Sequence, residues 1–490
     1  MSGVHIHDPG VNFIARSRGA LNDDNLQQAL EKAGSGFVHK RQAAIERVPN
    51  FEAMRDRALR ARQRALKNLD VYLLHFEKKV IEAGGQVHWV ETPDEMRQTV
   101  VDLCHQYDAR TVTKGKSMVG EEVELNEALE EAGIEPQETD LGEYVIQLAH
   151  ERPSHIVAPA LHKTKAQVQS LFREHHNLGE RDLDEVESIV NEARDVIRDR
   201  FLGADVGITG ANMLIAETGT AAIVTNEGNG DLTATLPRTH IVTTSIDKVI
   251  PTWKDASAIL RVLARSATGQ DITTYTTFFT GPKSEQDEDG PENFHIVLMD
   301  NRRTEILGSE YEEMLHCIRC GACMNHCPVY QSVGGHTYNS VYPGPMGAVL
   351  TPLLRHGKDD YQLPNASTFC GRCESVCPVR IPLPGLMRKL RDQEQREATL
   401  NKASTLAVKL FCRLSNRPGL YRRLTSPAVN LLHWLSGRRG RFRSIPFMSG
   451  WTRHRDFTAP QGASFQTQWR SRKSPQRGGS PQEKRSRRNG

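Results

Sequence analysis

The chain has 490 residues, and at about 150 residues per domain this length predicts two or three domains. Hydrophobic residues make up 38% and charged residues 25%, and no run approaches the roughly 18 apolar residues of a membrane span, so we expect no bilayer-crossing segment. The formal net charge of +3 hides an asymmetry, because residues 401–490 contain 20 Lys and Arg against 2 Asp and Glu. An acidic body therefore precedes a basic C-terminal segment.

The N-terminal stretch MSGVHIHDPGVNFIARSRG contains neither an apolar core segment nor a small-residue cleavage site. We therefore expect no secretory signal and a cytoplasmic protein. Disulfides are rare in that reducing compartment, yet seven of the nine cysteines crowd between Cys317 and Cys377. Such a cluster of cysteines indicates a metal-binding site.

The first predicted element is a helix over residues 40–83, where apolar residues recur at three- and four-residue steps up to a glycine pair. From Gln86 to about Val297, short β-rich runs such as QVHWV alternate with amphipathic stretches such as PDEMRQTVVDLCHQY. This alternation predicts an α/β fold with a largely parallel sheet covered by helices. Within it, residues 214–252 predict consecutive strands with tight turns, and residues 283–293 predict a solvated acidic loop.

Two cysteine runs follow. The first has the pattern C-x2-C-x2-C-x3-C-P and contains Cys317, Cys320, Cys323 and Cys327. The second has three cysteines, Cys370, Cys373 and Cys377. Thiolates suit both zinc and iron–sulfur clusters. Zinc sites commonly use two separated C-x2-C pairs, whereas three closely stepped cysteines with a displaced Cys-Pro are the bacterial ferredoxin pattern, in which that fourth cysteine ligates the other cluster. The spacing therefore favours iron–sulfur.

This crossover rule predicts two clusters. Cluster 1, expected to be [4Fe–4S], receives Cys317, Cys320, Cys323 and Cys377. Cluster 2 receives Cys327, Cys370 and Cys373, because Ser367 occupies the position where a complete second run would have a further cysteine. Cluster 2 could be [3Fe–4S], or [4Fe–4S] with water, Ser367 or a substrate on its last iron.

An outside cysteine is the third alternative for cluster 2. Cys104 lies in the apolar helical pattern VVDLCHQY, which is typical of a small buried core residue. Cys412 is nearer to the two runs in the sequence and is the better candidate of the two. For either kind of cluster we expect electron transfer as the function.

Beyond the cysteines, the segment RLSNRPGLYRRLTSPAVNLLHWLSGRRGRFRS mixes Arg with Leu, Trp and Phe. It could lie on an anionic membrane surface or on an acidic partner, or be a solvated basic extension. No recognised motif supports nucleic-acid binding. Residues 471–490 have too few apolar groups to order themselves, and we expect a disordered tail.

With these motifs in view, the chain resembles the lactate utilization protein B family. TKGKSMVGEEVELNEAL and GANMLIAETGTAAIVTNEGNGDL are similar to its lactate-utilization domain, the two cysteine runs to its ferredoxin part, and SGWTRHRDFTAPQGASFQTQW to its C-terminal segment. The long sequence between the runs also resembles the α-helical ferredoxin domain of succinate dehydrogenase, fumarate reductase and glycolate oxidase iron–sulfur subunits. Some of those domains have a three-cysteine second site.

The resemblance implies an electron-carrying component that works with two companion proteins in the oxidation of L-lactate to pyruvate. It also implies an α/β domain similar to the glucosamine-phosphate deaminase, ribose-phosphate isomerase and coenzyme A transferase group. The electron acceptor is open, with a quinone-linked one as a candidate, and peripheral contact with the inner face of the membrane is an alternative to a purely cytoplasmic location. The competing functions are a self-sufficient small-acid oxidoreductase and an iron–sulfur regulator that binds nucleic acid.

Six further residues are candidates for site roles. In TKGKS, Lys114 and Lys116 could receive a carboxylate or phosphate beside a glycine turn, or be solvated lysines. Glu217 follows a predicted strand and could be catalytic or simply part of a turn. His240 alternates with apolar residues and is expected in the core. Two histidines could tune the clusters through hydrogen bonds, His316 and His326.

The sequence thus predicts five segments. They are an N-terminal helical region at 1–85, the α/β domain at 86–300, the ferredoxin-type domain at 301–395, a basic segment at 396–470 and the tail at 471–490.

Overall fold

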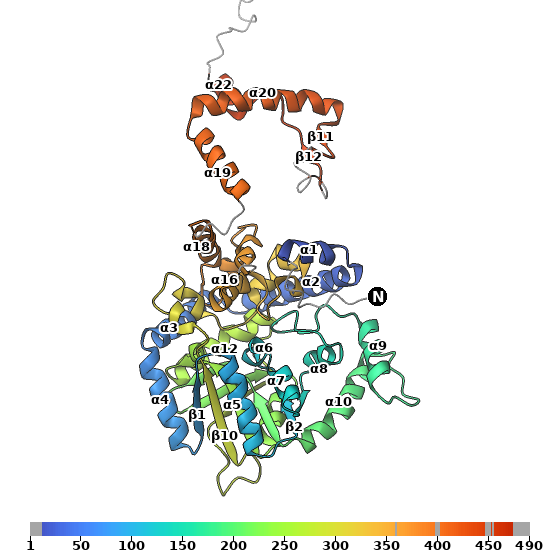
Figure 1. The fold of residues 1–490 in the computed structure, drawn as a ribbon, viewed down its shortest axis with the longest axis vertical. Helices are drawn as coiled ribbons and strands as arrows, with labels where there is room; N and C mark the ends of the chain where they lie inside the picture. The colour runs from blue at the N-terminus through green and yellow to red at the C-terminus, as the bar shows by residue number, and fades with distance from the viewer. Residues whose placement is uncertain (1–11, 358–359, 397–401, 446–451, 453–454, 474–490) are drawn as a thin grey trace, which may run out of the picture. The chain divides into compact units, whose positions relative to one another are not determined.

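The computed structural model describes residues 12–357, 360–396, 402–445, 452 and 455–473. The chain divides into two compact units, Met1–Glu394 and Gln395–Gly490. The first unit contains the α/β region and all seven clustered cysteines, and its sheet and helices are seen in Figure 1.

Four helices open the first unit, and they are α1 (Phe13–Leu21), α2 (Asp24–Glu46), α3 (Phe51–Lys67) and α4 (Leu69–Glu82). The prediction of one continuous helix over residues 40–83 is therefore wrong, because three separate helices cover this range. Pro49 has no backbone N–H and disfavours helical geometry at Val48, so α2 ends before it. Asn68 leaves the helical region, with φ −133° and ψ 44°, and separates α3 from α4.

Six strands form a parallel sheet in the order β1 (Gln86–Val90), β10 (Asn293–Met299), β7 (Thr239–Ser245), β4 (Val206–Thr209), β2 (Thr111–Lys114) and β3 (Glu135–Glu138). Along β10, Ile296 and Leu298 pack on the side of α4. Val297 and Met299 pack on the opposite side, with α5 (Pro93–Gln106). Helices therefore cover both faces, and the predicted α/β fold with a parallel sheet is confirmed.

A second sheet has the order β8 (Val249–Ile250), β5 (Met213–Ile215), β6 (Thr220–Thr225) and β9 (Tyr275–Phe279). The prediction of consecutive strands over 214–252 holds for β5, β6, β7 and β8 but misses the helix α11 (Asn229–Thr235). Gly228, at φ 72°, turns the chain into this helix, a conformation that favours glycine. Residues 283–293 form a largely exposed turn-rich loop, as predicted.

The other helices of the α/β region are α6 (Met118–Glu122), α7 (Leu125–Glu131), α8 (Leu141–Leu148), α9 (Lys165–His175), α10 (Val186–Gly203), α12 (Trp253–Ala267) and α13 (Arg303–Ile306). Among them α12 packs against α3 and α2. The N-terminal helices and the α/β layers therefore share a core.

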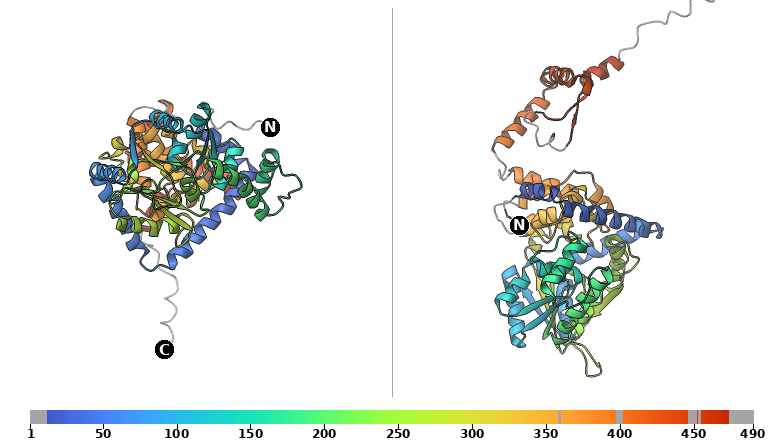
Figure 2. Two further views of the ribbon diagram at one scale, coloured as in Figure 1. Left: turned by 90° about the horizontal axis from the view of Figure 1, so that it is seen from below. Right: turned by 90° about the vertical axis from the view of Figure 1, so that its right-hand side faces the viewer.

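The cysteine region contains helices and no strand among its described residues. Its elements are η2 (Glu312–His316), α14 (Ala322–Asn325), α15 (Pro328–Val333), η3 (His336–Tyr338), α16 (Gly344–Arg355), η4 (Asp360–Asn365), α17 (Arg372–Val376) and α18 (Leu383–Arg396). Helices α1 and α2 contact α15, and the right-hand view of Figure 2 shows these blue helices beside the yellow and orange cysteine region. The proposed boundaries at 85 and 300 thus cross one compact unit, and the division stays a prediction.

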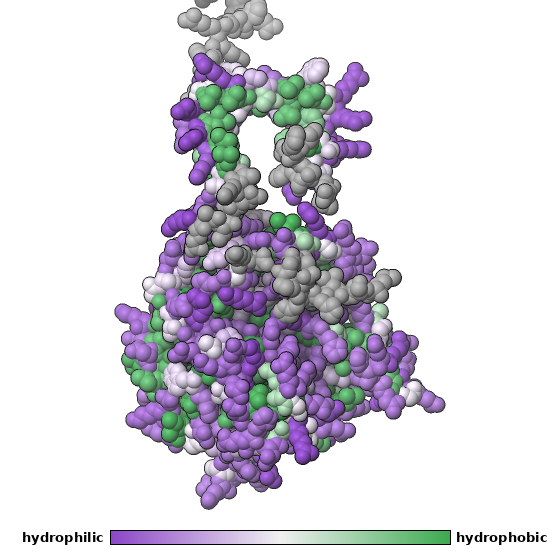
Figure 3. Space-filling view, in the orientation of Figure 1, coloured by the Kyte–Doolittle hydropathy of each residue, from purple (hydrophilic) through white to green (hydrophobic). Residues whose placement is uncertain are grey.

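The second unit contains α19 (Lys402–Ser415), α20 (Pro418–Ser436), η5 (Gly437–Arg439), the short pair β11 (Arg441–Phe442) and β12 (Phe457–Thr458), and α22 (Phe465–Lys473). Apolar side chains gather along one side of α19 and α20 and hydrophilic ones project from the other (Figure 3). No described helix is long and apolar enough to cross a membrane. The predicted tail, 471–490, lies outside the described residues except for 471–473, which end α22.

Candidate metal centre

The two cysteine runs follow the same backbone course. Arg319 (φ 56°) and Gly321 (φ 75°) flank the second cysteine of the first run, and Phe369 (φ 54°) and Gly371 (φ 76°) flank its counterpart in the second. Left-handed conformations cost a residue with a side chain about 1 kcal/mol or more. A short helix, α14 or α17, then follows, and these two helices contact each other. One structural motif is therefore used twice, side by side.

Ser367 has in the second run the position that Cys317 has in the first. The Arg319 N–H donates to Cys317 Sγ at 3.4 Å, and the Phe369 N–H donates to Ser367 Oγ at 3.1 Å. Equivalent backbone groups therefore orient a sulfur in one run and a hydroxyl oxygen in the other.

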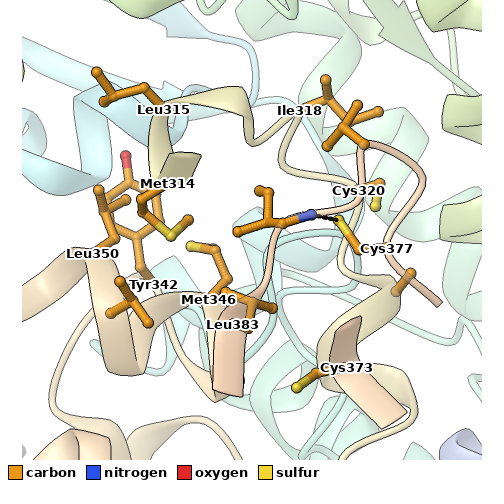
Figure 4. Packing of buried hydrophobic residues seen from close by; sticks show 14 of the residues in the cluster. Met314, Leu315, Ile318, Cys320, Tyr342, Met346, Leu350, Cys373, Cys377 and Leu383 are labelled. Carbon is orange, nitrogen blue, oxygen red and sulfur yellow. Dashed lines mark hydrogen bonds between the residues drawn. The ribbon is translucent and has the colours of Figure 1, made fainter. Parts of the chain in front are cut away.

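Four thiols line one small cavity, and they belong to Cys317, Cys320, Cys323 and Cys377. None is in a disulfide. Burial raises the pKa of Cys377 to about 11. Burial and the neighbouring Cys317 and Cys320 raise the pKa of Cys323 well above its ordinary value. Figure 4 shows Cys320 and Cys377 on facing loops, with the Ile381 N–H donating to Cys377 Sγ at 3.4 Å.

The other three clustered cysteines form a second group. Burial raises the pKa of Cys373 to about 12, with Cys327 and Cys370 adding to the shift. Cys370 is exposed, and the pKa of its thiol is lowered by hydrogen bonds from the Arg372 N–H and the Thr368 hydroxyl. Cys323 of the first group also interacts electrostatically with Cys373, so the two groups are neighbours.

The first group is surrounded by buried cations that the sequence analysis missed. They lie at most 9% exposed and interact electrostatically with its thiols, and they are Arg41, Arg55, Arg62, Lys248 and Arg319. Arg319 is inside the first run and could have been singled out from C-I-R-C. The rest come from α2, α3 and the turn after β7, where nothing local signals a role.

The residues present fit iron–sulfur clusters. Thiolates are the ligands that such clusters use, and free thiolates would be costly at these buried positions without a bound cationic centre. Backbone N–H groups that donate to Cys317 and Cys377 sulfur, together with the buried cations, suit an anionic cluster. Under the predicted crossover assignment, each of the seven cysteines would be a cluster ligand.

The two histidines predicted beside the clusters lie in the same region. Burial, followed by the charge of Arg62, lowers the pKa of His316 to about 4. His326 Nδ1 lies 2.9 Å from the Ala322 carbonyl oxygen, and its buried Nε2 has no hydrogen-bond partner among the described residues. Their tuning of a cluster stays a prediction.

Lys114 fits neither role that the sequence allowed. It is 1% exposed, and its ammonium group lies 2.5 Å from Glu121 and 2.7 Å from Glu138. One buried and one partly buried carboxylate therefore satisfy it, and it is neither solvated nor available to an anion. His240 is in the core, as predicted, with Nε2 2.8 Å from Thr209 Oγ1.

Glu217 and Lys116 lie in different surroundings. Glu217 is exposed, and its carboxylate accepts from the Trp253 N–H at 3.0 Å, which caps α12. Lys116 lines a cavity of about 220 Å³ whose wall also contains Cys320 and Arg319. Of the two, only Lys116 is placed to meet a ligand.

The two outside cysteines are far from equivalent. Cys104 is fully buried in α5 and packs with Val100 and Leu103 in the core of the parallel sheet, a hydrophobic cluster that contains none of the other cysteines. Burial raises the pKa of its thiol to about 12. Cys412 is exposed in α19 of the second unit.

Comparisons with known proteins match both halves of this arrangement. The LUD domain model matches residues 73–299, and the 4Fe-4S dicluster domain model matches residues 313–381. A crystal structure of a DUF162 family protein from Deinococcus radiodurans aligns with 47% of this chain and 98% of its own, at 12% identity and a TM-score of 0.26.

Curated relatives cover nearly the whole chain. It is 39% identical to the uncharacterized electron transport protein YkgF of Escherichia coli K12, over 95% of this chain and 97% of that one. It is 42% and 41% identical to lactate utilization protein B of Bacillus velezensis and Bacillus pumilus, over 94% of this chain and 97% of each relative. With an α/β LUD domain and a 4Fe-4S dicluster region in one chain, this iron–sulfur protein belongs to the lactate utilization protein B family.

Proposed function

We propose that the chain is the iron–sulfur electron-transfer component of a multi-protein system that oxidises L-lactate to pyruvate. The observation that carries the proposal is the pair of neighbouring thiol groups in a chain about two-fifths identical to lactate utilization protein B. Oxidation of lactate to pyruvate releases two protons and two electrons, and the electrons leave to an acceptor outside this chain.

When bound, two iron–sulfur clusters supply one-electron carriers. The cavity-lining thiols would hold cluster 1, of the [4Fe–4S] type, through Cys317, Cys320, Cys323 and Cys377. The second group would hold cluster 2, as [3Fe–4S] or as [4Fe–4S] with a non-cysteine ligand, through Cys327, Cys370 and Cys373. The hydroxyl of Ser367, oriented by the Phe369 N–H, supports the second form.

The surroundings of the thiols support a direction for the electrons. In the first group Cys320 and Cys377 are buried and the other two thiols are half-buried, and the group faces the cavity at Cys320. The second group reaches the surface at Cys370. Electrons would enter at the buried group and leave at the exposed one, where a partner can approach.

The partners in this proposal are two companion proteins and an acceptor that is quinone-linked. Among the described residues, α19 and α20 carry exposed apolar side chains such as Phe411 and Trp434 beside basic ones. This composition supports peripheral contact with an anionic membrane. Sedimentation with anionic and with neutral vesicles tests it, because binding should need the anionic lipid and weaken with salt.

Reconstitution tests the central proposal. The chain is purified anaerobically, its iron and sulfide are quantified, and lactate oxidation by the companion proteins is measured with and without it. We expect about seven or eight irons per chain and acceptor reduction only when the chain is present. An active preparation that contains stoichiometric zinc and no sulfide would refute the cluster assignment.

The cavity beside Cys320 favours a second candidate, a self-sufficient small-acid oxidoreductase. The same reconstitution separates the two functions. If lactate reduces the clusters of the isolated chain within the turnover time of the complete system, the second candidate replaces the first.

A further inference from the structure

The cavity of about 220 Å³ lies where an α/β sheet places a ligand site. The chain runs from β2 to the edge strand β3, then returns to the other side of β2 with β4 and continues to β7. Lys116 follows β2, Gly210 follows β4 and Lys248 follows β7, and all three line the cavity. Open parallel sheets bind ligands at the carboxyl ends of their strands, at this kind of reversal.

Two buried cations in the cavity wall lack full partners. Lys248 is 8% exposed, and in the described part of the chain its ammonium group makes no hydrogen bond or ion pair, although Asp247 and Cys317 interact with it electrostatically. Arg319 is 9% exposed, and its buried Nη1 has no hydrogen-bond partner in the described part of the chain. Its other nitrogen, Nη2, lies 3.8 Å from Asp247 Oδ2, and its guanidinium lies 5.1 Å from the ring centre of Tyr342. Burying a charge without a partner is costly, so an anion bound in the cavity would stabilise the charged forms of both side chains.

The neighbourhood has more buried positive than negative charge. Arg303 forms ion pairs with two buried carboxylates, with Glu122 at 2.7 Å and with Asp247 at 2.9 Å. Arg62 donates only to backbone carbonyls. An anionic cluster 1 would offset part of the excess, but Lys248 lines this cavity and not the one formed by the four thiols.

The same cavity has a second, acidic pole. Burial and the neighbouring Asp140 raise the pKa of Glu227, and Lys116 opposes that shift. Burial and Arg319 lower the pKa of Lys248 to about 7, and Asp247 opposes that shift. The two sets of charges are therefore separate, and both face the cavity. A carboxylate suits the cationic pole, and a group that donates a hydrogen bond suits the acidic one.

We propose that this cavity binds a short carboxylic acid with a polar substituent, a 2-hydroxy or 2-oxo acid of three or four carbons, with its carboxylate on Lys248 and Arg319 beside Cys320. The cavity of about 220 Å³ has room for a molecule of this size. Asp140 and Glu227 disfavour a dianion such as phosphate. The proposal concerns binding by this chain alone and stands apart from the electron-transfer role.

Calorimetric titration of the anaerobically purified, cluster-loaded full chain with L-lactate, pyruvate and inorganic phosphate tests the site. We expect one molecule of acid per chain and phosphate binding at least about tenfold weaker, together with an acid-dependent change in the electron paramagnetic resonance of the reduced cluster at Cys320. Lys248→Met should weaken acid binding by about 10- to 100-fold. Lys254→Met, at an exposed lysine in α12, should change it by less than about twofold.

Two further variants distinguish this cavity from the open iron of cluster 2 as the place where the acid binds. Ser367→Cys fills the proposed open position of cluster 2 and should leave acid binding intact. Loss of binding in this variant would instead indicate that the acid binds to that iron. Thr225 Oγ1 is buried in the cavity region without a partner among the described residues. Thr225→Val should weaken binding by about three- to tenfold with full iron retained, which keeps the test valid if Lys248→Met loses its clusters.

Three results overturn the proposal. They are the absence of acid binding at about 10 mM in a preparation with intact cluster spectra, phosphate binding as tight as acid binding, and unchanged affinity in Lys248→Met. Each can occur while reconstituted lactate oxidation still depends on the chain, so failure of the binding site and failure of the electron-transfer role are distinguishable.

Discussion

The first and second cysteine runs share a backbone course and differ in their surroundings. Around Cys320 the thiols are buried or half-buried, and cations from three distant segments lie within electrostatic range. Around Cys370 the thiol is exposed and Ser367 stands at the first ligand position. Local sequence repeats the ligand loop, and the tertiary structure then gives each copy a different charge and solvent environment.

This difference in surroundings should affect the reduction potentials of the two proposed clusters. Net charge, hydrogen bonds to sulfur and solvent exposure set the potential of an iron–sulfur cluster. Buried cations would stabilise the more negative, reduced state of a cluster at Cys320, so under the proposed function this group accepts the electrons. Under the same proposal, the group that is exposed at Cys370 passes them to a partner.

The largest effect is expected from Cys320→Ala. The change removes a ligand of the buried group, and iron should fall by about four atoms per chain, with loss of lactate-dependent acceptor reduction. Anaerobic iron and sulfide analysis with electron paramagnetic resonance measures it. Full iron content in this variant would show that the two runs do not form the two proposed ligand sets.

Arg303→Met should distinguish the two environments by stability. Arg303 is fully buried between Glu122 and Asp247, so its removal leaves two buried carboxylates and should lower the free energy of unfolding by about 3–5 kcal/mol. Arg380, after the second run, pairs with Glu52 and Asp56 near the surface, and Arg380→Met should cost less than about 1 kcal/mol. Anaerobic denaturant unfolding measures both, and equal losses would contradict the contrast.

Ser367→Cys should make the second run more like the first. A further thiolate stabilises the oxidised state, so the potential of cluster 2 should fall by on the order of 100 mV while cluster 1 is unchanged. Redox titration followed by electron paramagnetic resonance measures the shift. Ser375→Cys, at an exposed serine in α17, is the matched control and should leave both potentials where they are.

The smallest effects are expected outside the two runs. Cys412→Ser should alter neither cluster spectrum. Cys104→Ser should also leave both spectra unchanged, although a buried hydroxyl in the apolar core should lower the free energy of unfolding by about 1–3 kcal/mol. If either variant removes the cluster 2 signal and Ser367→Cys is silent, a distant cysteine is the missing ligand.

The sequence by itself determined the cysteine spacing, the missing thiol at Ser367 and the parallel α/β fold, because these depend on residue order and local periodicity. It failed where long-range contacts decide. The pairing of Lys114 with Glu121 and Glu138, and the gathering of Arg41, Arg62 and Lys248 around the first run, required segments far apart in the chain. Burial and charge pairing belong to the folded neighbourhood of a side chain, so only the tertiary structure could assign them.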